Sequence, residues 1–344
     1  MSADTIDLRS DLHAPPTEAM WDAMRSAKLG WATYGEDPSV NELQERMAAL
    51  LGKESALWVP TCGMANLVAL LTIAPRGSAV VVEASSHVLT SEAMGIEEVA
   101  GLDVQSLWAD DGRLDPAEVE ELIVDSGALM LVLENTHTRA GGTVLSPQLT
   151  ADLAGAAQRH GAYVHLDGAR LFNAAVALEV PVADLAGTVN TVAVSLNKGL
   201  CAPMGTILAG RTRVIELAHE TLRRLGGASV HKAGIAAAAA LVALDTLVDR
   251  LADDHRHARE LGALLQEIPG VEVDPRRIET NIVLAEVSGT EHTPDEFLAL
   301  LAEHGVLGVV RDTTRVRFVT HRLIGDEEVA QVAERVALAV AADR

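Results

Sequence analysis

Lysine is scarce in this chain of 344 residues, which holds only four, at positions 28, 53, 198 and 232. Cysteine is scarcer still, with only Cys62 and Cys201. Two cysteines are too few for a disulfide framework, which is typical of a protein from a reducing compartment. Lysine and arginine together number 27 against 49 acidic residues, so the formal net charge is −22. This charge argues against a general nucleic-acid binder, because a phosphate backbone would be repelled.

Long hydrophobic runs are also missing. The longest apolar stretch, Gly234 to Leu244, falls short of a membrane span and is expected to pack in the core or against another subunit. The first residues are acidic and lack the apolar segment of a signal peptide. With 27 glycines, only 12 prolines and 49% hydrophobic residues, the composition is that of a soluble globular protein. We therefore expect a cytoplasmic protein that contacts neither membranes nor nucleic acid, and we predict no metal site.

Short apolar strands alternate with amphipathic helices from about residue 55 to 210. The strands are apolar nearly throughout, as strands buried on both faces are. This order predicts an α/β fold with a mostly parallel central sheet that helices cover on both faces. The strand candidates are 78–82, 128–133, 162–166, 191–196, 205–209 and 281–286. Helix candidates between them include 115–126 and 146–160.

The pattern changes after a long helix that is predicted from about residue 233 to 254. The residues from about 255 to 344 indicate helix, strand, helix, strand and helix, the order of a smaller α+β domain. We therefore predict three parts, namely an N-terminal arm at residues 1–30, a large domain at 31–245 and a small C-terminal domain at 246–344.

One of the four lysines, Lys198, stands where a lysine can act in covalent catalysis. It follows the apolar run 191–197 and precedes Gly199. On a tight turn at the end of a buried strand, desolvation lowers the pKa of a lysine and makes its amine nucleophilic. The alternative is an ordinary exposed lysine on a strand-to-loop turn.

A carboxylate upstream strengthens the first interpretation. Asp167 ends an apolar strand and is followed by Gly168 and Arg170. Ligands of parallel sheets bind at the carboxyl ends of the strands, and the 31 residues from Asp167 to Lys198 (198 − 167) match one strand–helix–strand unit. Such a pair suits pyridoxal phosphate, whose aldehyde forms a Schiff base with the lysine while the carboxylate keeps the pyridine nitrogen protonated. Alone, Asp167 would also suit a helix N-cap.

Pyridoxal phosphate also needs a cradle for its phosphate. Residues 60–68, with Cys62 and Gly63, place small side chains just before a helix, whose N–H groups and positive dipole end bind anions. His87, which follows the strand at 78–82, is a candidate to stack on the cofactor ring. An ordinary turn and a hydrogen-bonded surface histidine are the alternatives.

Together these features resemble the threonine aldolase family, pyridoxal phosphate enzymes with the aspartate aminotransferase fold (fold type I). The resemblance covers nearly the whole chain. Its motifs in this sequence are Asp7–Asp11, Tyr34–Asn41, Glu134–His137 with Gly141–Gly142, His165–Asn173, Leu196–Leu200 with Ala202–Gly205, and Arg317–His321.

The resemblance implies a role for each matching residue around the cofactor. Lys198 would form the Schiff base, Asp167 would pair with the pyridine nitrogen, and His87 would stack on the ring. Cys62 and Gly63 occupy the phosphate cradle. Arg170 follows Asp167 in the same motif and is also assigned to the cofactor site.

The substrate side is implied in the same way. Ser10, Arg170 and Arg317 would hold the substrate carboxylate, since a planar guanidinium matches a carboxylate better than an ammonium does. His137 would reach the β-hydroxyl. The residues leave open whether His137, His87 or a bound water is the base, although an imidazole has a suitable pKa near ~6.5.

The resemblance implies an aldolase that reversibly cleaves L-β-hydroxy-α-amino acids, such as threonine, allo-threonine or β-aryl and β-alkyl serines, to glycine and an aldehyde. It also implies a homodimer or homotetramer whose active sites are shared between subunits. The alternatives are a transaldolase, a β-eliminating lyase or an amino-acid racemase with the same cofactor. A non-catalytic binding protein is a further alternative, but such a protein has no need for both Lys198 and Asp167.

Departures from the family pattern cluster at the expected site. The family reads Pro-Ser-Gly-Thr-Met-Gly-Asn where this chain has residues 60–66, so Cys62 replaces a glycine and Gly63 a threonine. The lost hydroxyl is worth roughly 1–3 kcal/mol if it bonds a charged phosphate. His231 replaces an arginine, and cofactor retention should then weaken as the pH rises above its pKa. For Cys62 we favour a small buried thiol over a nucleophile.

Overall fold

The computed structural model describes residues 5–91 and 95–342, which form two compact units. The larger unit contains residues 16–140 and 144–248. The smaller unit contains the segment that ends at Pro15, the short segment Gly141–Thr143 and the segment that begins at Asp249. The domain boundaries expected at residues 30 and 245 remain predictions.

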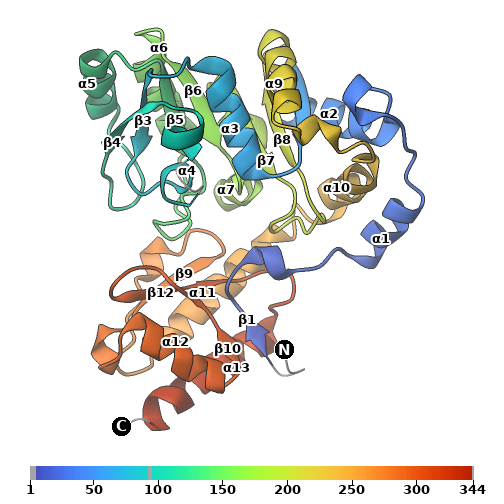
Figure 1. Cartoon of the computed structure of the whole chain (residues 1–344). Helices are drawn as coiled ribbons and strands as arrows, with labels where there is room; N and C mark the ends of the chain where they lie inside the picture. Colours follow the sequence, from blue (N-terminus) through green and yellow to red (C-terminus); the bar gives the residue numbers. More distant parts are fainter. Residues whose placement is uncertain (1–4, 92–94, 343–344) are drawn as a thin grey trace. The chain divides into compact units, whose positions relative to one another are not determined.

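A seven-stranded sheet forms the centre of the larger unit (Figure 1). Its strand order is β2-β8-β7-β6-β5-β3-β4. The strands from β7 to β4 run parallel, whereas β8 is antiparallel to both of its neighbours. The strands are β2 (Ser55–Val59), β3 (Ala79–Glu83), β4 (Asp103–Leu107), β5 (Met130–Glu134), β6 (Tyr163–Asp167), β7 (Thr191–Ser195) and β8 (Thr206–Gly210).

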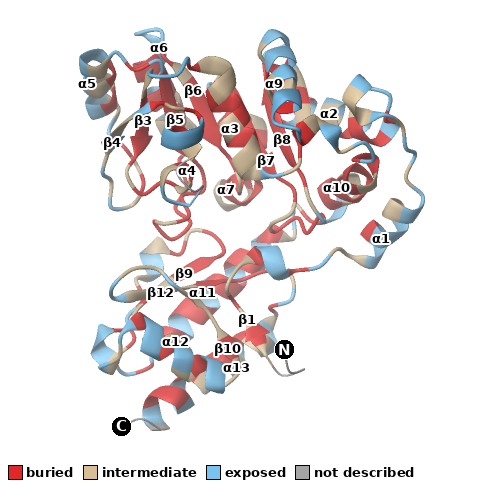
Figure 2. Cartoon of the chain, viewed as in Figure 1, coloured by how far each residue is buried: buried red, intermediate tan, exposed pale blue. Residues whose placement is uncertain are grey.

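Helices cover this sheet on both faces, as apolar strands require. Helices α3 and α9 pack on one face and α5 and α6 on the other. Figure 2 shows the inner strands as buried and the outer surfaces of α5 and α9 as exposed, while the edge strand β4 has no buried residue. The helices of this unit are α1 (Glu18–Arg25), α2 (Pro38–Leu50), α3 (Cys62–Ile73), α4 (His87–Thr90), α5 (Pro116–Ser126), α6 (Pro147–Gln158), α7 (Leu171–Leu178), α8 (Val182–Ala186), α9 (Thr212–Arg224) and α10 (Gly234–Thr246).

The smaller unit builds its own core around an antiparallel sheet. Alternate residues of its strands, such as Val283, Ala285, Val316 and Phe318, point into this core, as the two-residue period of a strand dictates. The elements are β1 (Ile6–Asp7), β9 (Ile282–Glu286), β10 (Val306–Leu307), β11 (Val309–Val310), β12 (Arg315–Val319), α11 (Leu251–Gln266), α12 (Pro294–Glu303) and α13 (Asp326–Ala342).

The predicted strands and the α/β class are confirmed, but one predicted helix is wrong. The helix expected from about 233 to 254 is two helices, because α10 ends at Thr246 and α11 begins at Leu251. The chain passes from one unit to the other at residue 249, so the two helices pack in different cores. Residues 247–250, which separate the two helices, include neither glycine nor proline, so no local signal marks the break. Strands β2 and β4 were not predicted from the sequence.

No helix among the described residues is both long and apolar enough to cross a bilayer.

Candidate active site

Polar side chains end the apolar strands at one edge of the large sheet. Glu83 ends β3, Glu134 ends β5 and Asp167 ends β6, and Lys198 follows the end of β7. These four strands are adjacent in the sheet and parallel, so their carboxyl ends meet at one edge. Glu134 and Asp167 are partners in register. This is the edge at which parallel sheets bind ligands.

Asp167 is almost fully buried, with 1% of its surface exposed. Oδ1 accepts a hydrogen bond from the backbone N–H of Ala169 at 3.0 Å, and the Cys62 thiol donates to the same oxygen at 3.7 Å. Oδ2 accepts from the side-chain amide of Asn66 at 2.9 Å. Burial raises the pKa of Asp167, and the Glu134 carboxylate adds to this, while Lys198 opposes it.

Lys198 lies on the turn that leaves β7 and is half-buried. Its carbonyl accepts a hydrogen bond from the N–H of Cys201 at 2.8 Å, which closes the turn. Its ammonium acts electrostatically on both Asp167 and His87. The two residues that the sequence pairs for cofactor binding are therefore brought to one site.

His87 begins the short helix α4 and is half-buried. Its backbone N–H donates to Glu134 Oε2 at 2.7 Å, while Oε1 of the same carboxylate accepts from the N–H of Thr138 at 2.9 Å. Burial lowers the pKa of the His87 imidazole, although Glu134 and Asp167 oppose this. Glu134 thus fixes the backbone that carries His87 beside Asp167.

His137 is fully enclosed, with 1% of its surface exposed. Its Nε2 lies 2.9 Å from Glu83 Oε2, and its Nδ1 accepts a hydrogen bond from the N–H of Ala140 at 3.3 Å. A Cβ atom on Gly112, whose φ is +75°, would lie 2.4 Å from the imidazole, so only glycine fits there. Both ring nitrogens of His137 are therefore engaged by the protein.

Arg170 and the start of α3 border the same strand ends. Arg170 is 5% exposed and donates from Nη1 to the Thr138 hydroxyl at 3.1 Å. Thr61 caps α3, because its hydroxyl accepts from the N–H of Met64 at 3.2 Å. Cys62 and Gly63 form the first turn, whose backbone N–H groups lie outside the helical ladder. Cys62 is half-buried, whereas a buried thiol was expected.

Ser10 and Arg317 belong to the smaller unit, where they lie on neighbouring segments. Arg317, on β12, donates from Nη2 to the carbonyl of Arg9 at 3.2 Å. Ser10 caps the following turn, since its hydroxyl accepts from the N–H of Leu12 at 3.2 Å. The tertiary structure thus brings together two residues more than 300 positions apart, which the sequence assigned to one carboxylate.

Comparisons with known proteins decide the family. A family model described as Beta-eliminating lyase matches residues 7–289. The low-specificity L-threonine aldolase 1 of Arabidopsis thaliana is 36% identical over 335 residues, which cover 94% of this chain and 93% of that protein. The chain belongs to this family. It is therefore a pyridoxal phosphate-dependent lyase of the threonine aldolase type, as the sequence motifs predicted.

Solved structures confirm the fold. The threonine aldolase of Leishmania major superposes with a TM-score of 0.82 at 20% identity, covering 97% of this chain and 99% of that one. An aspartate aminotransferase from Rhodobacter sphaeroides superposes with a TM-score of 0.78 at 18% identity, covering 99% and 93%. The predicted fold type I architecture is therefore correct.

The described side chains fit this cofactor in two respects. Asp167 is a buried carboxylate whose hydrogen bonds and neighbouring Lys198 compensate its charge only in part, since burial still raises its pKa, and a cationic pyridine nitrogen would add to that compensation. Lys198 lies at the next strand end, near enough to act on Asp167 electrostatically. The individual cofactor roles of Lys198, Asp167, Arg170, His87, Cys62 and Gly63 remain predictions.

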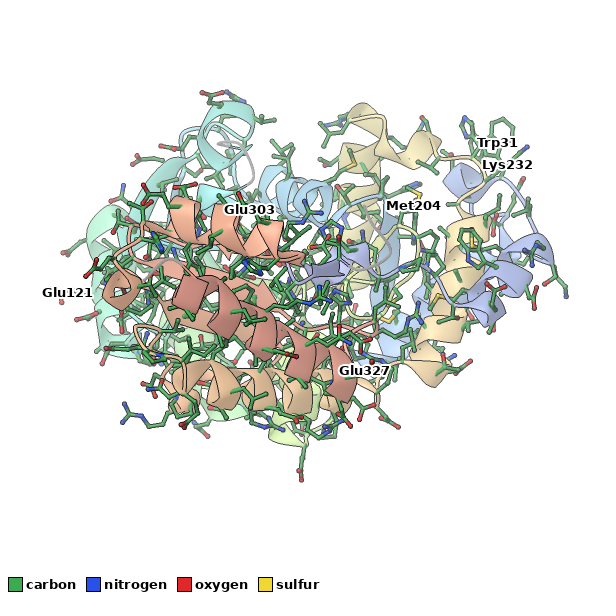
Figure 3. The ribbon with its side chains drawn as sticks, turned by 90° about the horizontal axis from the view of Figure 1, so that it is seen from below. Trp31, Glu121, Met204, Lys232, Glu303 and Glu327 are labelled. Atoms are coloured by element: carbon green, nitrogen blue, oxygen red, sulfur yellow. The ribbon has the colours of Figure 1, made fainter. Side chains whose placement is uncertain are left out.

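We expect Glu83→Ala to lower the free energy of unfolding of the cofactor-free protein by about 3 kcal/mol or more. Its carboxylate accepts hydrogen bonds from His137, from the N–H and hydroxyl of Ser85 and from the N–H of Ala109, and the buried donors of His137 and Ser85 would be left without an acceptor. Urea denaturation measures the change. Glu121→Ala, at an exposed position that Figure 3 labels at the edge of the molecule, should change stability by less than about 0.5 kcal/mol. Equal effects would show that the Glu83 cluster is not structural.

His231, which replaces the family arginine, is exposed and packs against residues of the segment 31–33. Its ring stands edge-on to Trp31, with centroids 5.9 Å apart, and its Nδ1 lies 3.5 Å from the Thr33 hydroxyl. Figure 3 shows Trp31 and Lys232 at this edge of the larger unit. The role of His231 toward phosphate remains a prediction.

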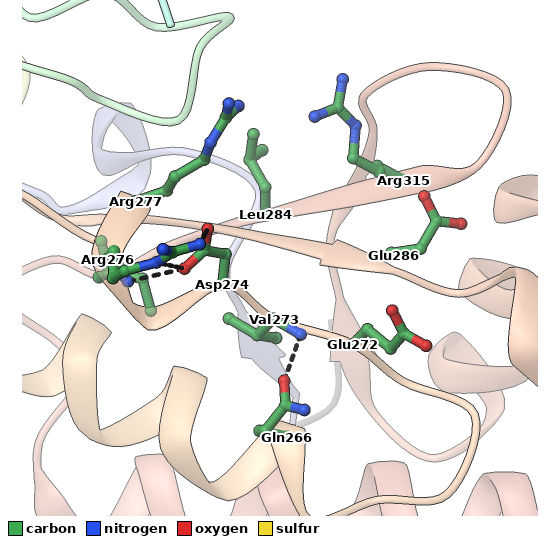
Figure 4. Close-up of a pocket in the computed structure, with 10 residues that line it drawn as sticks. Gln266, Glu272, Val273, Asp274, Arg276, Arg277, Leu284, Glu286 and Arg315 are labelled. Carbon is green, nitrogen blue, oxygen red and sulfur yellow. Dashed lines mark hydrogen bonds and ion pairs between the residues drawn. The ribbon is translucent and has the colours of Figure 1, made fainter.

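A cavity of about 500 Å³ lies in the smaller unit (Figure 4). Several of its polar side chains are already paired, since Arg276 bonds Asp274 and Gln266 accepts from the N–H of Val273. Arg315, also in its wall, is held by Asp312. None of the predicted site residues in the described chain lines it.

Four residues of the site had no role in the sequence analysis: Asn66, Glu83, Glu134 and His165. Glu83 and Glu134 carried the same signal as Asp167, a carboxylate at the end of an apolar strand, and could have been found by it. Asn66 and His165 carried no such signal, because a polar residue inside a helix or strand acquires its meaning only from its partner.

Proposed function

We propose that this enzyme cleaves L-β-hydroxy-α-amino acids to glycine and an aldehyde, and that it also runs the reaction in reverse. Buried Asp167 beside half-buried Lys198, at adjacent strand ends of a threonine aldolase-type chain, is the observation that carries the proposal. Threonine, allo-threonine and β-aryl or β-alkyl serines are the candidate substrates. The Arabidopsis relative is named a low-specificity L-threonine aldolase, which supports this range.

Each residue then has a chemical task. The bound cofactor supplies an electron sink for the pair left at Cα when the Cα–Cβ bond breaks. Lys198 holds the cofactor covalently, and the Asp167 carboxylate keeps the ring nitrogen cationic. Arg170, Ser10 and Arg317 bind the substrate carboxylate, for which a guanidinium offers two parallel N–H groups. The β-hydroxyl loses its proton to a base, and Cα gains one.

Of the two candidate histidines, we propose His87 as the base. Both ring nitrogens of His137 are engaged, by Glu83 and by the N–H of Ala140. The His87 ring has no hydrogen-bond partner among the described residues, and burial lowers the pKa of His87, so the imidazole is neutral and able to accept a proton near pH 7. His137 would then orient the site through Glu83.

A substrate panel tests the proposal and separates it from the alternatives. The purified protein with pyridoxal phosphate is given L-threonine, L-allo-threonine and β-phenylserine, and we expect glycine and aldehyde in equal amounts. Glycine with acetaldehyde should regenerate the β-hydroxy amino acid. A 2-oxo acid with ammonia would instead show β-elimination, and a D-amino acid would show racemisation.

We further propose that the enzyme works as a homodimer or homotetramer with shared active sites, as the family resemblance implies. Sedimentation equilibrium of the cofactor-loaded protein tests this, and a monomer at micromolar concentration with full activity would contradict it.

A further inference from the structure

Asp167 stands at the end of a chain of buried hydrogen bonds that the proposed mechanism does not use. The Thr191 hydroxyl lies 2.9 Å from His165 Nδ1, and His165 Nε2 lies 3.0 Å from Asn66 Oδ1. Asn66 Nδ2 in turn donates to Asp167 Oδ2 at 2.9 Å. Thr191, His165 and Asn66 each have 0% of their surface exposed.

The sheet explains how these side chains meet. His165 and Asp167 are two positions apart on β6, so they point to the same face of the sheet. Thr191, on β7, is the register partner of His165. Asn66 comes from α3, which packs on that face. The two-residue period of the strand therefore places the imidazole one step behind the carboxylate.

In this series of hydrogen bonds, every donor points toward Asp167. Because Asn66 gives its N–H to Asp167, its carbonyl oxygen faces His165 and requires a donor there. Burial lowers the pKa of His165 to about 3, so the ring is neutral and carries a single proton. That proton must be on Nε2, which leaves Nδ1 to accept from the Thr191 hydroxyl.

The surroundings of Asp167 make its ionised form sensitive to a hydrogen-bond donor held in a fixed direction. Of the charged and titratable groups that face it, the Glu134 carboxylate on β5 disfavours its ionised form, while Lys198 beyond β7 and His87 on α4 favour it. The thiol of Cys62 on α3 donates over a longer distance, 3.7 Å. A side-chain amide locked with its N–H toward Asp167 offsets part of the cost of burial.

We propose that Thr191, His165 and Asn66 form a positioning relay that holds Asp167 ionised and oriented for the cofactor's ring nitrogen. This inference rests on the proposed role of Asp167. The proposed site assigns none of the three a direct role toward the cofactor. They act through the fixed direction of the Asn66 amide, which would turn its oxygen toward Asp167 if the imidazole carried its proton on Nδ1.

The test uses two matched variants, Thr191→Val and Thr206→Val. Both threonines are fully buried on adjacent strands, but the Thr206 hydroxyl has no hydrogen-bond partner among the described residues. The dissociation constant for pyridoxal phosphate is measured by titrating the cofactor-free protein between pH 6 and 9. We expect Thr191→Val to weaken binding about three- to tenfold and Thr206→Val to leave it unchanged, and Thr191→Ser should restore it.

The pH dependence has a definite sign. Protonated Asp167 cannot pair with a cationic ring nitrogen, so affinity falls as the pH drops through the pKa of Asp167. Loss of the relay raises that pKa further, so the fall should begin at a higher pH in Thr191→Val than in the wild type. A purely structural role of Thr191 would weaken binding equally at every pH and would contradict the proposal.

A double-mutant cycle shows whether the effect passes through Asn66. Asn66→Ala removes the donor itself, and we expect cofactor affinity to fall about tenfold to a hundredfold. Adding Thr191→Val to Asn66→Ala should then change nothing further. Additive effects would overturn the relay, because Thr191 would act by another route.

Two further measurements separate the possible failures. The ¹⁵N shifts of His165 in the wild-type protein should show a neutral Nε2–H ring that does not titrate between pH 5 and 8, and the opposite tautomer would overturn the inference without any mutation. Asp167→Asn checks the underlying assignment. If Asp167→Asn weakens cofactor binding but Thr191→Val does not, the relay is wrong and the proposed role of Asp167 is supported. If neither does, the role of Asp167 itself is wrong.

Discussion

Lys198→Ala should abolish both the cofactor's covalent attachment and the enzyme's activity. Lys198 is the lysine at the sheet edge where Asp167 lies, and its ammonium acts electrostatically on both Asp167 and His87. Alanine has no amine to form the Schiff base, so the yellow absorbance of lysine-bound cofactor should disappear. We expect turnover of L-threonine below about one-thousandth of the wild-type rate.

Lys28→Ala is the matched control, because Lys28 is exposed on the surface of the same unit. It should retain the absorbance band and full turnover. Circular dichroism and gel filtration of Lys198→Ala establish that the chain still folds. A folded Lys198→Ala variant with near wild-type turnover would remove Lys198 from the active site.

Asp167→Asn should separate cofactor binding from stability. Asparagine has nearly the shape of aspartate but no negative charge, so it cannot hold the ring nitrogen as a cation. We expect affinity for pyridoxal phosphate to fall about tenfold to a hundredfold, the effect of losing a charge-assisted hydrogen bond, and turnover to fall further. Absorbance titration and steady-state rates measure the two effects.

The same variant should be more stable than the wild type when cofactor is absent. Burial raises the pKa of Asp167 above its ordinary value of 3.8, so the folded state binds a proton that the unfolded chain has already released. Stability is therefore lost as the pH rises from about 4 through the raised pKa of Asp167, and the cost is complete only above that pKa. Asp167→Asn should raise the melting temperature by a few degrees at pH 7.5, and the gain should shrink toward pH 4.

Asp184→Asn, at an exposed position on α8, should change neither cofactor affinity nor melting temperature. If Asp167→Asn instead melts well below the wild type, the Asp167 carboxylate is needed for the fold, and its loss of affinity could not be assigned to the cofactor.

Much of the architecture follows from local patterns in the sequence. Apolar runs ending at Asp167 or just before Lys198 mark parallel strands buried on both faces, and their spacing marks a strand–helix–strand unit. The break between α10 and α11 does not follow, because the alanine-rich segment is locally compatible with one continuous helix. α10 packs in the larger unit and α11 in the smaller one, and a boundary set by membership of two different cores has no local signature.

The active site divides in the same way. Motif by motif, the sequence alone determined the family, the cofactor and the pairing of Asp167 with Lys198, because those residues lie at strand ends that the topology must bring together. Tertiary structure alone decided that Glu83 engages His137 across 54 positions and that Asn66 reaches Asp167 across 101. Such contacts depend on which helix packs on which face of the sheet, and this packing is determined by the contacts of the whole core.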